Sequence, residues 1–392
     1  MMDEEDRFAL IILAVLAFYF APSLVPETSY RTVNPIANGF FLLHFYIREY
    51  SLVLIPVLFF AGAIASFISK EELTKQLSGG REDFGAYLWA LWAGFLLSIY
   101  SYTIIPLFAG IRKKGTKLGP SMTFLYMASS VNVLSIVFAG VVLGWDIAIA
   151  AALFAALSAY IIGFFMNDLY DDEKTRYKGL FQFLDDRKQR KGFKELDTLA
   201  PHETQGLATL LLTLAAMIVV AAMDTDWMLK GGAFLLLSVL VCYQIKSGFT
   251  KKEVVYWINE TYIFFMEIIP MLLVAIFIAG MFSSAVKDNS LADYVKGNNV
   301  FSSLVATLLG ISFYFPTLIE VPLARILLDL GMDRGAVIAF LLAAYVLSPP
   351  TMLFLKRIIG ADKTRSYVVM VVLCCTLSGI VYGIATGVIR LY

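Results

Sequence analysis

Charged residues are scarce in this chain: they make up only 16% of its 392 residues, whereas hydrophobic residues make up 59%. A soluble domain carries about 25% charged residues, so this composition excludes an ordinary soluble protein and predicts a membrane protein. The 31 Lys and Arg residues equal the 31 Asp and Glu residues. No excess of positive charge therefore points to nucleic acid as a partner.

Cysteine and histidine are also rare. Cys242, Cys374 and Cys375 lie in apolar stretches and have neither the spacing of a disulfide framework nor that of a metal site. His44 and His202 are isolated, and no GxxxxGK[ST] loop for ATP is present. We therefore expect no cofactor, no ATP-driven motor and no enzyme active site within the membrane.

The chain contains instead a series of apolar runs of roughly 20 residues, the length that crosses a bilayer as a helix. These runs are residues 8–26, 51–69, 118–143, 147–166, 206–224, 228–245, 261–285, 334–355 and 366–389. Residues 33–50 are expected to form a separate interfacial helix, and the acidic start favours a retained first helix over a cleaved signal. The predicted fold class is an all-α polytopic protein that crosses the cell membrane several times.

Two stretches, residues 100–144 and 316–360, match each other without a gap. Identical residues recur 216 positions apart, and the pairs are Pro106/Pro322, Leu107/Leu323, Gly115/Gly331, Gly119/Gly335, Phe124/Phe340, Leu125/Leu341, Ala128/Ala344, Phe138/Phe354 and Gly144/Gly360. A further proline, Pro56, has a counterpart in Pro270. Matched prolines and glycines in register indicate an internal duplication, which is typical of transporters built from two structural repeats.

The duplication divides the chain into three parts. Residues 1–167 form the first transmembrane repeat and residues 168–205 a charged connector that we expect in the cytoplasm. Residues 206–392 form the second repeat, in which residues 206–224 are an extra linking helix.

Residues 84–111 and 300–326 are ambiguous, because each stretch is either one long helix or a re-entrant hairpin of two half-helices. The hairpin alternative places slightly more Lys and Arg residues on the cytoplasmic side. It also leaves an odd number of crossings between equivalent points, which makes the repeats inverted. Two full spans would make them parallel.

The repeated motif PLxxxxxxxGxxxGxxxxFL begins at Pro106 and again at Pro322, and each copy leads into a polar break and an apolar run. In this the chain resembles the predicted-permease family that includes the organoarsenical efflux permease ArsP. The resemblance implies efflux of a small solute. Members of that family often carry Cys-Ser-Cys before the first motif, where this chain has Tyr100, Ser101 and Tyr102. This departure argues against an arsenic or soft-metal substrate, and the two tyrosines could instead stack on an aromatic or amphipathic solute.

Polar residues and prolines interrupt the apolar runs at four places, two in each repeat. Non-helical backbone within a membrane has to be buried in protein or to line a watery cavity, so these breaks predict a central substrate pathway. The candidate pathway residues are Tyr100, Ser101, Tyr102, Thr103, Ser129, Ser130 and Asn132 in the first repeat, and Thr317, Tyr345, Ser348 and Thr351 in the second. The structural alternative is that their hydroxyl groups only hydrogen-bond between helices.

Two acidic residues, Glu267 and Glu320, lie inside apolar sequence shortly before prolines and complete the candidate pathway. Placing an acid at the middle of a membrane costs about 2.5–3.5 kcal/mol on insertion scales, and an acid buried there is expected to be protonated near neutral pH. Such an acid suits proton coupling. The alternative for Glu320 is a structural ion pair with Arg325, which we also include among the pathway residues.

Together these features favour a permease that moves a small solute across the cell membrane by alternating access, as proton-coupled efflux. A passive channel is the main alternative, and a membrane scaffold that docks a partner through residues 168–205 is another. The expected partners are a small-molecule substrate and the lipid bilayer, with no nucleic acid, and a homo-oligomer is left open.

Overall fold

The computed structural model describes residues 11, 13, 35–67, 77, 83–97, 104–170, 204–223, 225–285, 300–312 and 318–386. All the regular elements in these ranges are helices, which confirms the all-α class. They are α2 (Pro35–Phe67), α4 (Phe84–Leu97), α5 (Ile104–Lys113), α6 (Leu118–Ser130), α7 (Val133–Val142), α8 (Trp145–Tyr170), α10 (Thr204–Ala222), α11 (Trp227–Gly248), α12 (Lys251–Ala285), α14 (Val300–Ser312), α15 (Glu320–Asp329), α16 (Arg334–Val346), α17 (Pro349–Ile359) and α18 (Ala361–Ala385). Within the described ranges, five helices are long and apolar enough to cross a membrane, or up to seven if two bent pairs each count as one span. The protein is therefore a multi-pass membrane protein.

Helix α2 is longer than the sequence pattern suggests. It runs without interruption from Pro35 to Phe67 and contains Pro56 in its interior. The expectation of a separate interfacial helix over residues 33–50 is therefore wrong. Arg48 and Glu49, which had favoured a boundary, lie on the exposed side of the continuous helix, and membrane helices tolerate an interior proline. Helix α12 likewise continues through Pro270.

The expected breaks within the apolar runs 118–143 and 334–355 are confirmed. Helices α6 and α7 meet at an angle of 43°, and α16 and α17 meet at 53°. The ambiguous stretches are not single long helices either, because α4 is separate from α5 and α14 is separate from α15. The turns expected near residues 100–103 and 313–317 lie outside the described residues.

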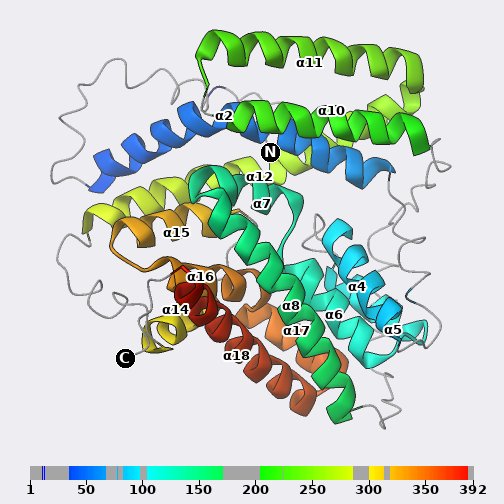
Figure 1. Cartoon of the computed structure of the whole chain (residues 1–392), viewed down its shortest axis with the longest axis vertical. Coiled ribbons are helices and arrows are strands. Elements are labelled where there is room, and N and C mark those ends of the chain that lie inside the picture. Colours follow the sequence, from blue (N-terminus) through cyan, green and yellow to red (C-terminus); the bar gives the residue numbers. More distant parts are fainter. Residues whose placement is uncertain are drawn as a thin grey trace, which may run out of the picture.

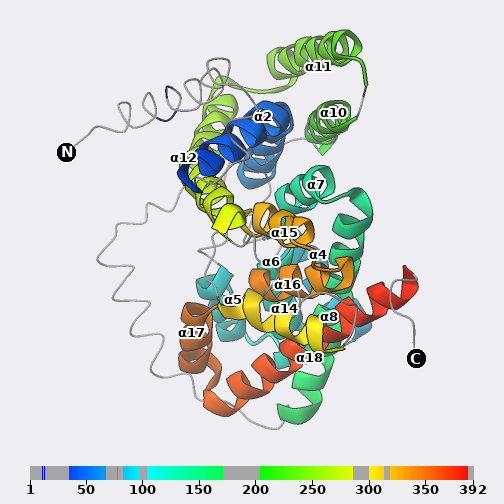
Figure 2. The same ribbon diagram turned by 90° about the vertical axis from the view of Figure 1, so that its left-hand side faces the viewer.

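The centre of the fold is formed by α6 and α16, which pack against each other. Every residue of α6 except Ser129 is buried, as is nearly all of α16. Helices α4 and α8 pack on α6, and α14 and α18 pack on α16. Figures 1 and 2 show α10 and α11 at one end of the molecule, beyond α2, with α12 beside α2.

Glycines allow this tight packing at equivalent places in the two halves. A Cβ atom at Gly94 would lie 3.0 Å from the Phe124 carbonyl oxygen, and one at Gly310 would lie 2.6 Å from the Phe340 carbonyl oxygen. Such distances are too short for a side chain, so glycine lets α4 approach α6, and α14 approach α16, backbone to backbone.

Candidate functional site

Glu320 is the first residue of α15 and is almost completely buried, with 2% of its surface exposed. Its Oε2 atom has no hydrogen-bond partner among the described residues. Buried polar atoms in proteins are nearly always hydrogen-bonded, so an unpaired carboxylate oxygen marks this position as a place where a proton, water or substrate group is needed.

The backbone next to Glu320 is strained. Leu318, two residues before it, has a φ angle of 83°, and it is the one non-glycine residue with positive φ in the described part of the chain. Such conformations cost of order 1–3 kcal/mol and cluster at functional sites. Tyr345 of α16 interacts electrostatically with Glu320, so the structure brings these two predicted residues together.

Arg325 does not pair with Glu320, and the expectation of that ion pair is wrong. The Arg325 Nε atom lies 3.2 Å from the Asp329 carboxylate, and its Nη1 atom donates to the Val142 carbonyl oxygen at 3.3 Å. The Arg325 side chain is about half exposed, at 47%. It therefore bridges α15 and the end of α7 instead of neutralising the buried acid.

Asn132 and Ser348 occupy the two helix breaks and begin α7 and α17. The Asn132 side-chain oxygen accepts a hydrogen bond of 2.7 Å from the Ser135 amide, and the Ser348 hydroxyl accepts from the Thr351 amide at 3.4 Å. The Ser348 and Thr351 hydroxyls also lie 2.8 Å apart. Both residues are N-caps, and they satisfy backbone donors that a break inside a membrane would leave exposed.

Ser129 and Ser130 lie at the end of α6, beside the first break. The Ser129 hydroxyl donates to the Leu125 carbonyl oxygen at 2.8 Å, and the Ser130 hydroxyl donates to the Met127 carbonyl oxygen at 3.1 Å. Both bonds stay within their own helix, so neither hydroxyl links two helices, as the structural alternative had supposed. Their acceptor lone pairs face the break.

The structure places Glu267 apart from the buried residues, on an exposed part of α12. The remaining predicted pathway residues lie outside the described ranges, and they are Tyr100, Ser101, Tyr102, Thr103 and Thr317. Among the described residues, no group of three His, Cys, Asp or Glu side chains is arranged to hold a metal ion. Buried Cys375 instead contacts the Tyr126 hydroxyl at 3.7 Å.

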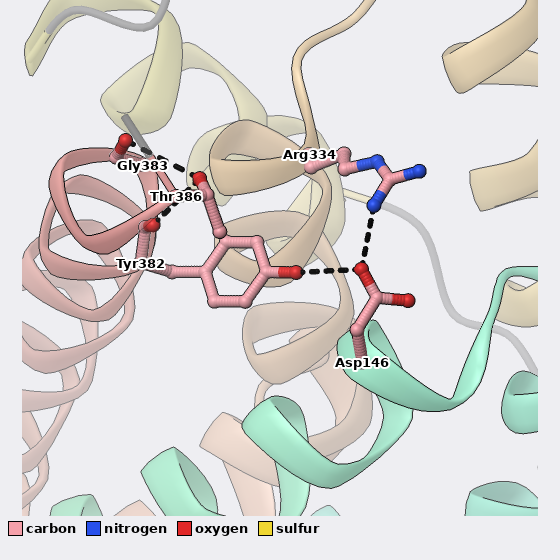
Figure 3. Close-up of polar contacts among 5 residues, drawn as sticks. All are labelled: Asp146, Arg334, Tyr382, Gly383 and Thr386. Atoms are coloured by element: carbon pink, nitrogen blue, oxygen red, sulfur yellow. Dashed lines mark hydrogen bonds and ion pairs between the residues drawn. The ribbon is translucent and has the colours of Figure 1, made fainter. Parts of the chain in front are cut away.

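One polar cluster was not anticipated from the sequence. Figure 3 shows Asp146, at the start of α8, between Arg334, at the start of α16, and Tyr382, near the end of α18. Arg334 Nη1 lies 2.5 Å from Asp146 Oδ2, and the Tyr382 hydroxyl donates to the same oxygen at 3.1 Å. The cluster joins three helices from the two halves of the chain.

A second contact joins the opposite ends of α8 and α18. The Tyr170 hydroxyl, at the end of α8, lies 2.7 Å from the Ser366 hydroxyl near the start of α18. Since Asp146 and Tyr382 join the other ends, the two helices run antiparallel and are tied at both ends. Asp146 and Asp362 are 216 residues apart and both begin a helix, so extending the repeat comparison past Gly144 and Gly360 would have drawn attention to these positions.

The geometry thus combines a buried acid with an unpaired oxygen, two capped helix breaks, and two contacts that hold α8 to α18. Ion pairs as exposed as that of Asp146 and Arg334 contribute little stability, about 0–1 kcal/mol. Contacts of this strength can be broken and remade during a transport cycle, whereas Glu320 provides a group that could bind a proton away from bulk water.

Comparison with known proteins agrees with this arrangement. Residues 36–384 match the model of a family described as predicted permease. The chain is also 30% identical over 336 residues to the UPF0718 protein MJ0584 of Methanocaldococcus jannaschii, a match that covers 85% of this chain and 91% of that protein. No solved structure matches the chain. The chain therefore belongs to the predicted-permease family.

Proposed function

We propose that this protein moves a small solute out of the cell by alternating access between two inverted repeats, with Glu320 as the proton-carrying group. The observation that carries the proposal is the burial of Glu320 with an unpaired carboxylate oxygen. A proton-carrying residue has to be shielded from bulk water in one state and reached in another, and the burial of Glu320 meets the first condition.

The packing of equivalent helices supports the duplication. The contact of Gly163 in α8 with the Gly119 carbonyl oxygen recurs 216 residues on, between Gly379 in α18 and the Gly335 carbonyl oxygen. The contact of Gly94 with Phe124 and that of Gly310 with Phe340 are related by the same interval. Helices α6 and α16 also begin and end 216 residues apart.

The directions of equivalent helices support inversion. Helices α8 and α18 are antiparallel, and so are α2 and α12, because Gly39 near the start of α2 meets Phe277 near the end of α12. Repeats related by an axis along the membrane normal would have parallel equivalent helices, whereas an axis in the membrane plane makes them antiparallel. Substrate sites in such transporters lie near the midplane between the repeats.

The test is transport by the full-length protein in liposomes with an imposed pH gradient. Wild type is compared with Glu320→Gln, which keeps the size of the side chain but cannot carry a proton, against a panel of small toxic solutes that includes organoarsenicals. Solute movement and internal pH are both followed. We expect a solute that moves against its own gradient when protons flow, and at least a tenfold loss of that movement in Glu320→Gln.

Glu260→Gln is the matched control, because Glu260 is a partly exposed acid on α12. It should transport as wild type does. Equal proton-coupled movement by Glu320→Gln and wild type would show that Glu320 is structural. Saturable flux that ignores the pH gradient in both proteins would instead favour a passive channel.

A further inference from the structure

Helices α2 and α12 touch closely near both ends and separate in the middle. At one end, a Cβ atom at Gly39 would lie 2.8 Å from the Phe277 carbonyl oxygen, and a Cβ atom at Gly280 would lie 2.8 Å from the Asn38 carbonyl oxygen. At the other end, a Cβ atom at Gly62 would lie 3.1 Å from the Thr261 Cα atom. Between these contacts, each helix contains its proline, Pro56 or Pro270.

A cavity of about 190 Å³ occupies the space between the two glycine contacts. It is lined by residues 46–58 of α2, residues 265–276 of α12 and Phe138 of α7. Ile55 and Ile269, which each directly precede a proline, lie on opposite sides of it. Its place at the middle of two long helices, one from each proposed repeat, is where transporters of this architecture bind substrate.

The lining of this cavity restricts its occupant. No charged side chain contributes to it, and almost all of its surface is apolar. An unpaired charge in such surroundings is very costly. Three aromatic rings form one wall, with 5.0 Å between the ring centroids of Tyr46 and Tyr50 and 6.0 Å between those of Tyr50 and Phe138. Rings at these separations favour contact with apolar or aromatic groups.

One lining residue adds a polar requirement. The Tyr46 side chain is 3% exposed, and its hydroxyl has no hydrogen-bond partner among the described residues. A buried tyrosine hydroxyl usually has a partner, and leaving it unpaired costs about 1–3 kcal/mol. An occupant with one hydroxyl or carbonyl group could satisfy it.

We infer that the cavity between α2, α7 and α12 binds an uncharged, mainly apolar solute of one or two rings that carries a single polar group. An apolar cavity of about 150 Å³ holds benzene, so the present volume suits a slightly larger molecule. A lipid acyl chain would need a groove that is open along its length, whereas glycine contacts close this cavity at both ends. The inference rests on the proposed permease function, because it names the substrate class of that permease.

Binding is tested with the full-length protein in lipid nanodiscs and 4-fluorobenzyl alcohol as the probe. Saturable broadening of the fluorine NMR signal, displaced by excess benzyl alcohol, measures the site separately from partition into lipid. We expect saturable binding to wild type and at least tenfold weaker binding to Leu54→Trp, which fills the cavity. Leu240→Trp, on the exposed surface of α11, is the matched control and should bind as wild type does.

Two further variants keep the test independent of folding defects. Leu54→Ala enlarges the cavity and should retain the probe while gaining affinity for naphthalenemethanol. Tyr46→Phe should weaken binding of the alcohol about fivefold, the value of one hydrogen bond, but not binding of 4-fluorotoluene. Lack of saturable binding to wild type, or equal binding by Leu54→Trp and wild type, would overturn the inference.

The same variants separate this inference from the proposed function. Binding is measured without a pH gradient, so loss of proton coupling in Glu320→Gln does not affect it. If a transported solute is found and Leu54→Trp leaves its flux unchanged, the permease stands and the cavity is not its substrate site.

Discussion

At the scale of single residues, Gly163 and Gly379 each lie directly against a backbone carbonyl of a neighbouring helix. A Cβ atom would come within 2.7 Å of the Gly119 oxygen in one case and 2.5 Å of the Gly335 oxygen in the other. A backbone atom cannot move aside as the tip of a flexible side chain can, so Gly163→Ala and Gly379→Ala should each destabilise the protein by about 1–3 kcal/mol. Thermal unfolding in detergent measures this.

Gly231→Ala is the control for this prediction, because nothing lies within 4 Å of a Cβ atom at that position. It should leave the midpoint of unfolding unchanged or raise it slightly, since alanine favours a helix. Midpoints of Gly163→Ala and Gly379→Ala that match this control would contradict the close approach of α8 to α6 and of α18 to α16.

Single residues also show where sequence reasoning succeeds and where it fails. Asn132 and Ser348 could be predicted as breaks, because a polar residue within an apolar run has few other roles. The pairing of Arg325 with Glu320 failed because five residues along a helix place two side chains about 140° apart. Four residues bring them to about 40°, and Asp329 occupies that position relative to Arg325.

At the scale of elements, α7 and α17 each depend on one capping side chain. Asn132→Ala and Ser348→Ala should each lower stability by about 1 kcal/mol, because the amide of the third helical residue loses its acceptor. The exchanges Asn132→Ser and Ser348→Asn keep a capping oxygen and should cost less than half as much. Chemical denaturation of the purified variants measures the difference, and equal losses for both kinds of substitution would show that capping is not the cause.

Helices α8 and α18 supply a second prediction at this scale. If transport separates their ends, a bifunctional thiol reagent that joins Asp146→Cys to Tyr382→Cys should reduce flux at least tenfold. The background has Cys242, Cys374 and Cys375 replaced by alanine. The same protein without the reagent is the control. Full flux with the cross-link in place would show that these ends stay together throughout the cycle.

The bounds of elements were harder to predict than their existence. The apolar runs identified most of the described helices, because burial in lipid requires side chains that are apolar over the whole span. The continuity of α2 was missed because Arg48 and Glu49 suggested a boundary, although helical hydrogen bonds do not depend on the side chains. The cavity between α2 and α12 could not be predicted either, because residues more than 200 positions apart in the sequence line it.

At the scale of the whole molecule, the two halves meet through extensive helix packing, chiefly α2 with α12, α8 with α18 and α6 with α16. If they are independent repeats, a chain divided within residues 171–203 should reassemble. We expect fragments ending and starting in this segment to co-purify when co-expressed and to restore transport. Either fragment alone should show no transport, and failure of the pair to associate would mean that the halves fold only as one covalent unit.

Helix α11 has no buried side chain and packs mainly on α10. Its exposed residues include Trp227, Leu235, Leu236 and Val239, so the surrounding acyl chains supply most of its solvent. Extraction by detergent replaces that environment before it affects the centre of the fold. The α10–α11 hairpin is therefore where the choice of detergent should first show in proteolysis or hydrogen exchange, and native lipid retained during purification should protect it.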